Sequence, residues 1–317
     1  MQAPLAQAIQ TETKMTTVKL LVDGKHLLGE GVLWCERSGR LLWTDILASR
    51  LWCHTLANGE TQSWAMPEML ATFALTLDDD RLLLGLASQL AWFHFSSGKV
   101  TPIVAVESDL LTTRINDGRC DRQGRFVFGT KSDASDRAPN CSFYRLNTDL
   151  TLERLPLSPV VISNSICFSP DSATMYYCDT ISNTIRCCDY ESLDKTVPVQ
   201  AFNNDRLFAD LHDQPGSPDG STIDSQGCLW NAQWGGYRVV RFTPDGQIDR
   251  IIAIPVSQPS CVAFGGPGLS TLFVTTARED LSEQTLQSEP QAGGVFNISL
   301  EDVRGLPEGR FKGGGGA

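Results

Sequence analysis

The chain has 317 residues, of which 41% are hydrophobic and 20% are charged, and its formal net charge is −11. This apolar fraction is sufficient for a sizeable core and argues against global disorder. The acidic balance and the absence of a Lys/Arg-rich run argue against a nucleic-acid partner and against docking on anionic membranes.

The N-terminal residues 1–15 lack the basic start and apolar run of a signal peptide, and we expect them to form a flexible extension. No stretch approaches the roughly 18–20 apolar residues of a membrane helix. The 10 cysteines are scattered through apolar segments without a paired CxxC pattern. We interpret them as reduced thiols, and the sequence therefore predicts a cytoplasmic protein.

Short β-branched or aromatic runs alternate along the chain with turns rich in Gly, Asp, Asn, Ser and Pro, and amphipathic helical periodicity is almost absent. After the first strand, expected at 16–24, a repeated unit appears six times: a polar start, a short strand, a turn and an apolar run. In chain order the apolar runs are 41–43, 82–84, 126–128, 175–177, 229–230 and 272–274.

Each apolar run is followed by a further turn, a strand with an aromatic or branched centre, and a polar outer strand, as in 49–56 and 237–246. Four short strands in a unit that recurs about every 41–55 residues are typical of propeller blades. The sequence therefore predicts an all-β fold, a six-bladed β-propeller over residues 16–310. We expect the strand at 16–24 to close the ring and residues 311–317 to form a flexible Gly-rich tail.

Polar residues recur at one position of the repeat, near the start of the first strand of each blade. In a propeller these strands line the central channel, so equivalent positions converge on the axis. Each polar residue alone is explained as a turn residue, but their shared phase indicates a site of carboxylate and amide oxygens suited to Ca²⁺, Mg²⁺ or Mn²⁺. The six positions are Glu30, Phe73, Asn116, Asn164, Asp219 and Ser260 or Cys261.

Other catalytic signatures are missing from the sequence. The four histidines show no HExxH spacing, and there is no GxSxG elbow, Walker loop or GxGxxG after a strand. These absences argue against a zinc protease, a serine hydrolase of the α/β type and a nucleotide-binding enzyme.

Five segments closely resemble the senescence-marker-protein / gluconolactonase / regucalcin family of six-bladed propellers. The resemblance spans essentially all six blades, and its segments are 28–34, 113–130, 162–180, 217–236 and 259–277. It implies that Glu30, Asn164 and Asp219 hold one divalent cation, that Arg114 and Asn116 contact substrate, and that Asp219 also acts in catalysis.

The chain departs from the family pattern at three places. It has Val32 where the family commonly has proline after Gly-Glu-Gly, and Ser165 where it has glycine after Ser-Asn; neither changes an expected ligand. In the third blade it has Lys131 and Asp133 in a loop, 131–142, that we expect to overhang the channel mouth. We therefore predict that Lys131 contacts substrate and that this loop influences substrate choice.

The resemblance predicts a hydrolase of carboxylic ester bonds that converts a sugar (aldono) lactone to its aldonic acid. Asp219 is the expected general base, and Ca²⁺ the expected cation, with Zn²⁺, Mn²⁺ and Mg²⁺ as alternatives. We expect Asp117 and Asp179 to orient neighbours or cap turns. The lactone stays open among gluconate, galactonate, arabinonate and xylonate derivatives, and the chain is expected to be a monomer or weak homo-oligomer.

Two other classes of function remain as alternatives. A non-catalytic protein-interaction propeller is one, since residues 41–45 (LLWTD) resemble the YWTD repeat of receptor propellers. A cation-binding regulatory protein is the other. An interaction propeller has no reason to gather Glu30, Asn164 and Asp219 on the axis, and one site with three protein ligands makes a poor dedicated cation buffer. A different propeller hydrolase would use another ligand set.

Overall fold

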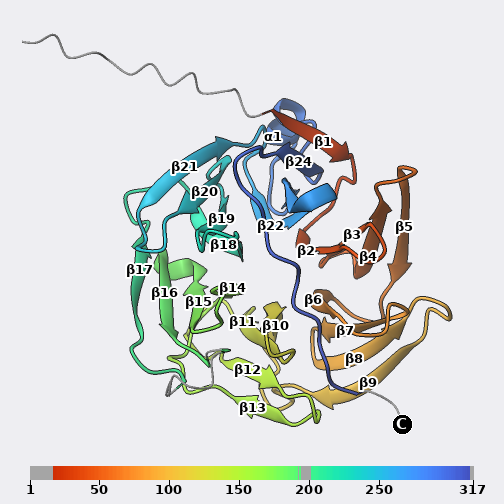
Figure 1. Cartoon of the computed structure of the whole chain (residues 1–317), viewed down its shortest axis with the longest axis vertical. Helices are drawn as coiled ribbons and strands as arrows, with labels where there is room; N and C mark the ends of the chain where they lie inside the picture. The colour runs from red at the N-terminus through yellow and green to blue at the C-terminus, as the bar shows by residue number, and fades with distance from the viewer. Residues whose placement is uncertain (1–16, 192, 194–200, 315–317) are drawn as a thin grey trace, which may run out of the picture.

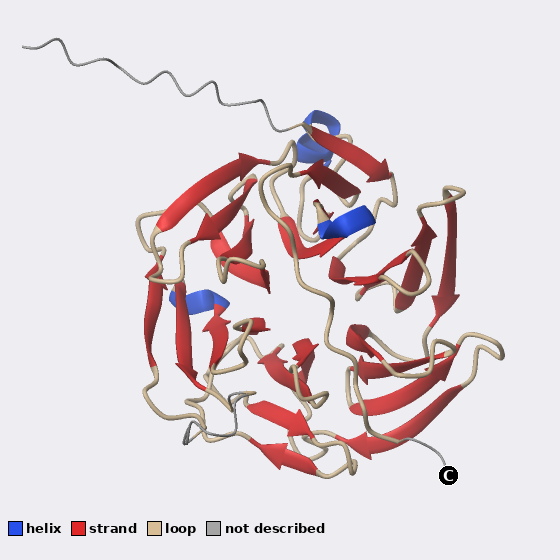
Figure 2. Ribbon diagram, in the orientation of Figure 1, coloured by secondary structure: helices blue, strands red, loops and turns tan. Residues whose placement is uncertain are grey.

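The structure is a computed structural model that describes residues 17–191, 193 and 201–314. In this part of the chain, 24 strands form six four-stranded antiparallel sheets. The sheets stand as blades around a central channel (Figures 1 and 2). The predicted six-bladed β-propeller is confirmed.

The strands of each blade follow one another outward from the channel (Figure 1). The innermost strands are β2 (Gly29–Cys35), β6 (Leu70–Leu75), β10 (Thr113–Cys120), β14 (Ser163–Phe168), β18 (Ser217–Ile223) and β22 (Pro259–Gly265). The second strands, which contain the predicted apolar runs, are β3 (Arg40–Asp45), β7 (Arg81–Leu86), β11 (Phe126–Ser132), β15 (Thr174–Asp179), β19 (Leu229–Trp234) and β23 (Thr271–Thr276).

The outer half of each blade consists of its third and fourth strands. The third strands are β4 (Arg50–Thr55), β8 (Gln89–His94), β12 (Phe143–Leu146), β16 (Thr184–Asp189), β20 (Arg238–Phe242) and β24 (Val295–Ser299). The outermost strands are β5 (Glu60–Ala65), β9 (Val100–Ala105), β13 (Leu152–Arg154), β17 (Arg206–Asp210), β21 (Ile248–Ala253) and β1 (Val18–Val22). The helices of the described residues are η1 (Thr180–Ser182), η2 (Pro267–Leu269) and α1 (Glu283–Ser288).

Burial explains the difference between inner and outer strands. In β7 every residue from Leu82 to Leu86 is buried, because neighbouring blades cover both faces of the second strand. Such a strand reads as a continuous apolar run rather than an alternating one. The outermost strand β5 has no fully buried residue and faces solvent.

The ring is closed by the first strand of the chain. β1 pairs antiparallel with β24, with Val18 opposite Ile298, and completes the sheet β1-β24-β23-β22. The predicted closing strand at 16–24 is therefore confirmed. Joining both ends of the chain in one sheet leaves no gap in the ring. The extension predicted at residues 1–15 lies outside the described residues.

The prediction of a flexible tail from residue 311 is wrong for residues 311–314. The side chain of Phe311 is fully buried, and its N–H donates to Leu75 O at 2.8 Å. The segment 300–314, here called the C-terminal strap, crosses the channel in dark blue (Figure 1) and bridges to Asp224 and Thr76. An aromatic side chain that fills the core fixes this segment, and residues 315–317 lie outside the described part.

Phe311→Ala is expected to lower the free energy of unfolding by about 3–5 kcal/mol, because it leaves a cavity in the core beside Trp92. Chemical denaturation followed by tryptophan fluorescence measures this loss. Leu111→Ala, at a side chain that is 94% exposed, is the control and should leave stability unchanged. An equally small effect of both substitutions would contradict a structural role for the strap.

Hydrogen bonds from side chains to carbonyl groups link neighbouring blades near the axis. Each bond starts on an inner strand of one blade and ends on the innermost strand of the next. They are Thr44 Oγ1 to Leu70 O (2.6 Å), Thr72 Oγ1 to Gly118 O (2.9 Å), Asn116 Nδ2 to Ser163 O (2.9 Å), Ser165 Oγ to Asp219 O (2.6 Å) and Ser260 Oγ to Gly29 O.

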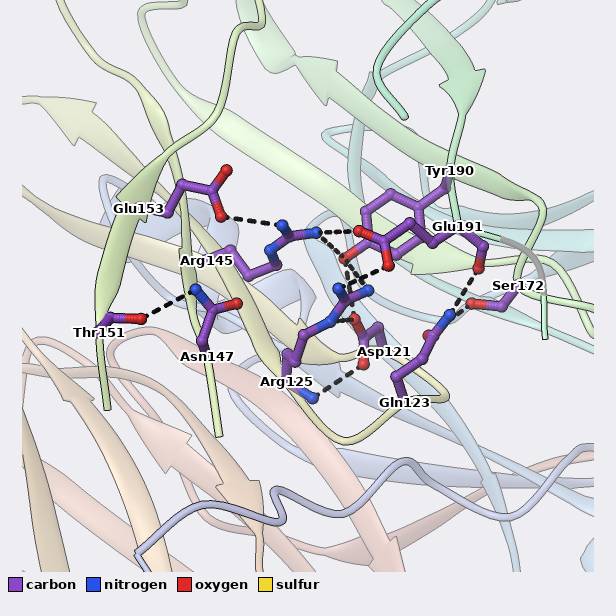
Figure 3. Close-up of polar contacts among 10 residues, drawn as sticks. All are labelled: Asp121, Gln123, Arg125, Arg145, Asn147, Thr151, Glu153, Ser172, Tyr190 and Glu191. Carbon is purple, nitrogen blue, oxygen red and sulfur yellow. Dashed lines mark hydrogen bonds and ion pairs between the residues drawn. The ribbon is translucent and has the colours of Figure 1, made fainter. Parts of the chain in front are cut away.

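A network of charged side chains joins the third and fourth blades farther from the axis (Figure 3). Arg125 Nε lies 2.6 Å from Asp121 Oδ2, which also accepts a hydrogen bond from Tyr190 at 2.9 Å. Arg145 pairs with Glu191 at 3.0 Å. Because the buried charges in this network are paired, we interpret it as part of the scaffold.

The 10 cysteines all lie among the described residues, and each is buried as a free thiol. Burial raises the pKa of Cys53 to about 11, and Arg40 opposes this shift. This agrees with their predicted role as small apolar side chains. Within the described residues, no helix combines the length and the apolar character needed to cross a membrane.

Candidate active site

Irregular pairing at the start of the innermost strands shapes the candidate site. The register of β2 with β3 shifts between Glu30 and Leu33, and that of β14 with β15 shifts between Asn164 and Cys167. In β18 the shift falls between Pro218 and Ser221, and so includes Asp219. Such bulges bend the strand and re-aim its side chains.

The backbone at two of these bulges is left-handed. Gly31, which follows Glu30, has φ 57°, a conformation that glycine adopts without strain. A Cβ at Gly31 would lie 3.8 Å from the ring of Phe73, the apolar member of the predicted set, which packs in the core. In the equivalent place after Asn164 the chain has Ser165, with φ 61°.

Two amide side chains meet across the third and fourth blades. Asn116 Nδ2 donates to Asn164 Oδ1 at 3.0 Å, and Arg114 Nη1 donates to Asn116 Oδ1 at 3.1 Å. Asn164 Nδ2 donates to Thr180 Oγ1 at 2.9 Å, and this hydroxyl donates to Pro218 O at 3.0 Å. Thr180 therefore fixes the orientation of the Asn164 amide and directs its oxygen toward Asn116.

Thr180 was not predicted from the sequence to belong to the site. One signal could have identified it: Thr180 directly follows Asp179, which ends β15 and lies level with the start of β14. The register Ser163–Asp179 shows that residue 180 must lie beside the first residues of the innermost strand.

The two carboxyl groups of the predicted ligand set lie near each other, with Asp219 buried and Glu30 partly buried. Burial raises the pKa of Glu30 to about 8; Asp117 and Glu279 add to this shift, while Gly31 N–H and Arg114 oppose it. Burial, followed by the charge of Glu30, raises the pKa of Asp219 well above its usual range. Two carboxylates in such a place need a positive charge or protons between them.

Asp117 and Asp179 hold backbone groups, as predicted. Asp117 accepts hydrogen bonds from Gly118 N and Ile166 N, each at 2.8 Å. Asp179 accepts from Val161 N at 3.0 Å and Ile162 N at 3.1 Å, and caps η1 through Ile181 N. Both carboxylates orient the segments that carry the site.

The site and the C-terminal strap lie at opposite ends of the channel. The proposed ligands occupy the first three residues of their strands. The strap contacts the last residues of the innermost strands: Arg310 bonds to Cys35 Sγ, and Phe311 N–H to Leu75 O. Inside that end, Arg119 pairs with Glu308 of the strap at 2.8 Å. A substrate would therefore approach from the end where Glu30 lies.

Three charged side chains flank the amides on the third blade. Arg114 and Lys131 are opposite each other in the pairing of β10 with β11. Asp133 lies between them, with Oδ2 3.3 Å from Arg114 Nε and Oδ1 3.8 Å from Lys131 Nζ. Burial and the charge of Arg114 lower the pKa of Lys131, and Asp219 is among the nearby groups that oppose this shift. Arg114, Asn116 and Lys131 thus lie together beside the carboxyl pair.

The donor set fits a hard divalent cation only if amides take part. Among the described residues, no group of three His, Cys, Asp or Glu side chains could hold a metal ion. Glu30 and Asp219 supply two carboxylates, and Asn164 supplies an amide oxygen whose orientation is fixed by Thr180. Oxygen donors of this mixed kind suit Ca²⁺, and the excess negative charge of the pair favours a cation.

The sequence profile of the SMP-30/Gluconolactonase/LRE-like region matches residues 28–278. The chain belongs to this family. The resemblance found in the sequence is therefore confirmed, and the match begins two residues before Glu30 and extends beyond the last innermost strand.

Two lactonases align with most of the chain. L-arabinolactonase of Azospirillum brasilense is 49% identical over 296 residues, which cover 93% of this chain and 95% of the relative. The 6-deoxy-6-sulfogluconolactonase of Pseudomonas putida is 33% identical over 94% of this chain and 99% of its own. These relatives confirm the predicted hydrolase class.

A solved structure from the family has the same fold. It is regucalcin from Agrobacterium tumefaciens, described as a calcium-binding protein, with a TM-score of 0.86 and 32% identity. The alignment covers 93% of this chain and 97% of that one.

Proposed function

We propose that this protein hydrolyses a sugar lactone to its aldonic acid at a divalent cation bound by Glu30, Asn164 and Asp219. The observation that carries the proposal is the pair of neighbouring carboxyl groups with raised pKa values, beside oriented amides at one end of the channel. The lactonase relatives support the reaction, and the calcium-binding relative supports Ca²⁺ as the cation.

Each residue of the site has a part in the proposed reaction. A divalent cation held there would polarise the lactone carbonyl and lower the pKa of a bound water. Asp219 accepts a proton from the water that adds to the carbonyl carbon. When the bond from this carbon to the ring oxygen breaks, Asp219 returns the proton to that oxygen, so the product is the open-chain hydroxy acid.

Arg114 and Asn116 provide the recognition of sugar oxygens in this proposal. Arg114 is buried and holds a positive charge beside the amides, where negative charge develops on the carbonyl oxygen. The Asn116 amide donates to Ser163 O and Asn164 Oδ1, so its oxygen, which accepts one bond from Arg114, is the atom that would accept a hydrogen bond from a sugar hydroxyl group. Lys131, opposite Arg114, would contact the end of the lactone that is remote from the carbonyl.

We propose L-arabinolactone as the first substrate to test, because the relative at 49% identity bears that activity in its name. The test is a panel of aldonolactones assayed with and without chelator. We expect hydrolysis of at least one pentonolactone or hexonolactone that stops on chelation and returns with Ca²⁺. Folded, cation-loaded protein that hydrolyses no lactone would overturn the proposal and favour the cation-binding regulatory alternative. A cytoplasmic monomer or weak oligomer remains the prediction from sequence.

Asp133→Asn is expected to shift substrate preference toward lactones that carry an anionic group. Asp133 offsets the charges of Arg114 and Lys131, so its neutralisation leaves one more positive charge at the site. We expect kcat/KM for a sulfonated or carboxylated lactone to rise on the order of tenfold relative to that for a neutral lactone. Asp136→Asn, at an exposed position of the same loop, is the control. Equal preference in wild type and Asp133→Asn would contradict this role.

A further inference from the structure

Ser165 adopts a backbone conformation that disfavours a side chain. Its φ is 61°, in the left-handed region, and the residue is fully buried. A residue other than glycine loses about 1 kcal/mol or more in this region, and such strain persists where surrounding contacts impose it. The contacts around Ser165 therefore hold its backbone in this conformation.

The hydroxyl group of Ser165 is the centre of a buried hydrogen-bond cluster. Ser165 Oγ donates to Asp219 O at 2.6 Å, and accepts from Ser221 Oγ at 3.1 Å and from Asn231 Nδ2 at 3.0 Å. Asn231 Nδ2 also lies 2.8 Å from Asp219 O. Ser165 and Asn231 are fully buried, and Ser221 is 2% exposed, so water does not compete with these bonds.

The cluster holds a carbonyl group that the sheet leaves unpaired. Asp219 lies in the bulge between Pro218 and Ser221, where the β18–β19 ladder is interrupted. Ser165 follows Asn164 directly on the neighbouring strand β14. One hydroxyl group thus connects the residue next to one proposed ligand with the backbone of another.

We infer that Ser165 is a positioning residue that sets the separation of Asn164 and Asp219, and through it the affinity of the site for a divalent cation. This inference rests on the proposed axial cation site. Groups that orient metal ligands typically contribute 10–100-fold to metal affinity. A bond that only joined two blades, such as that from Thr72 to Gly118, would contribute to stability but not to cation affinity.

Two substitutions separate positioning from simple stabilisation. Ser165→Gly removes the hydroxyl group but also relieves the left-handed strain, so the two effects on stability oppose each other. Ser165→Ala removes the hydroxyl group and keeps the strain, so this variant should be the less stable of the two. If Ser165 positions the ligands, both variants lose cation affinity to the same extent despite their different stabilities.

Ser172 provides a matched control. It is also a fully buried serine with a left-handed backbone, at φ 63°, and its hydroxyl group donates to Gln123 Oε1 at 2.9 Å (Figure 3). It lies in the turn before β15, in the network that joins the third and fourth blades. Ser172→Gly therefore repeats the strain relief and the loss of a buried hydrogen bond without touching the site.

The experiment is calorimetric titration of Ca²⁺ into metal-stripped full-length protein, with melting temperatures measured in parallel. We expect the Kd of Ser165→Gly and of Ser165→Ala to rise 10–100-fold, and that of Ser172→Gly to match wild type. Wild-type affinity in Ser165→Gly, or no measurable Ca²⁺ binding by wild type, would overturn the inference. Ca²⁺ binding that weakens as expected in a protein without lactonase activity would support it while overturning the proposed function.

Discussion

Asp219→Asn is expected to lower kcat for lactone hydrolysis by about a thousandfold or more while the propeller remains folded. The substitution keeps the size of the side chain but removes the group that accepts the proton of the attacking water, a contribution that typically reaches 10²–10⁴-fold. It also replaces one of the two proposed carboxylate ligands by an amide. Burial, with the charges of Glu30 and Asp117, raises the pKa of Asp219, and the substitution removes this titrating group.

Steady-state kinetics at saturating Ca²⁺ distinguish the loss of the general base from the loss of a cation ligand. A lower kcat that excess Ca²⁺ does not restore indicates the loss of the base, whereas recovery with excess Ca²⁺ indicates the loss of a ligand only. Asp245→Asn, an exposed position of the same blade, is the control and should retain the wild-type rate. Asp219→Asn with at least a tenth of the wild-type kcat would contradict the role of Asp219 as general base.

Metal-stripped protein is expected to lose stability as the pH rises from about 4.5 to about 8. Glu30 has a usual pKa of 4.5, and burial raises it to about 8 in the folded chain. Between these values the folded state binds a proton that the unfolded state has released, so the free energy of unfolding falls with rising pH. The raised pKa of Asp219 acts in the same direction. The loss is on the order of a few kcal/mol and is complete above the folded pKa of Glu30.

Thermal unfolding across this pH range, with chelator and with Ca²⁺, measures the effect. Ca²⁺ should raise the melting temperature most at the alkaline end, because the cation compensates for ionised carboxylates. Glu30→Gln should reduce the pH dependence in chelator, and Glu60→Gln, on the exposed strand β5, should leave it unchanged. A metal-stripped protein whose stability is constant between these pH values would show that the two carboxylates do not share a buried site.

Repetition made the fold and the candidate ligands predictable. Each blade contributes one strongly apolar second strand. Counting residues back from this strand locates the start of the innermost strand, which is where Glu30, Asn164 and Asp219 lie. Asp117 and Asp179 were predicted to be structural for a related reason. An acidic residue in a turn usually accepts backbone hydrogen bonds, as both do.

The contacts between blades were not predictable in this way, because they depend on residues distant in sequence. The ordered strap was not predicted, because a Gly-rich end suggests flexibility. In the structure Phe311 packs in the core, and Arg310 forms hydrogen bonds with the first two blades. Thr180 and Ser165 were missed as positioning groups because a hydroxyl group has no pattern of its own. The proposed role of Ser165 is inferred from its left-handed backbone conformation and its hydrogen bond to Asp219 O, which only the structure shows.

The most direct test of the cation site is the rate of L-arabinolactone hydrolysis by metal-stripped protein, measured as a divalent cation is added. The site of Glu30, Asn164 and Asp219 predicts negligible enzymatic rate without cation, and a rise that saturates at one equivalent per chain. Ca²⁺, Mn²⁺, Zn²⁺ and Mg²⁺ titrated in turn would identify the most effective ion. A full rate in protein shown by metal analysis to contain no cation would contradict the account.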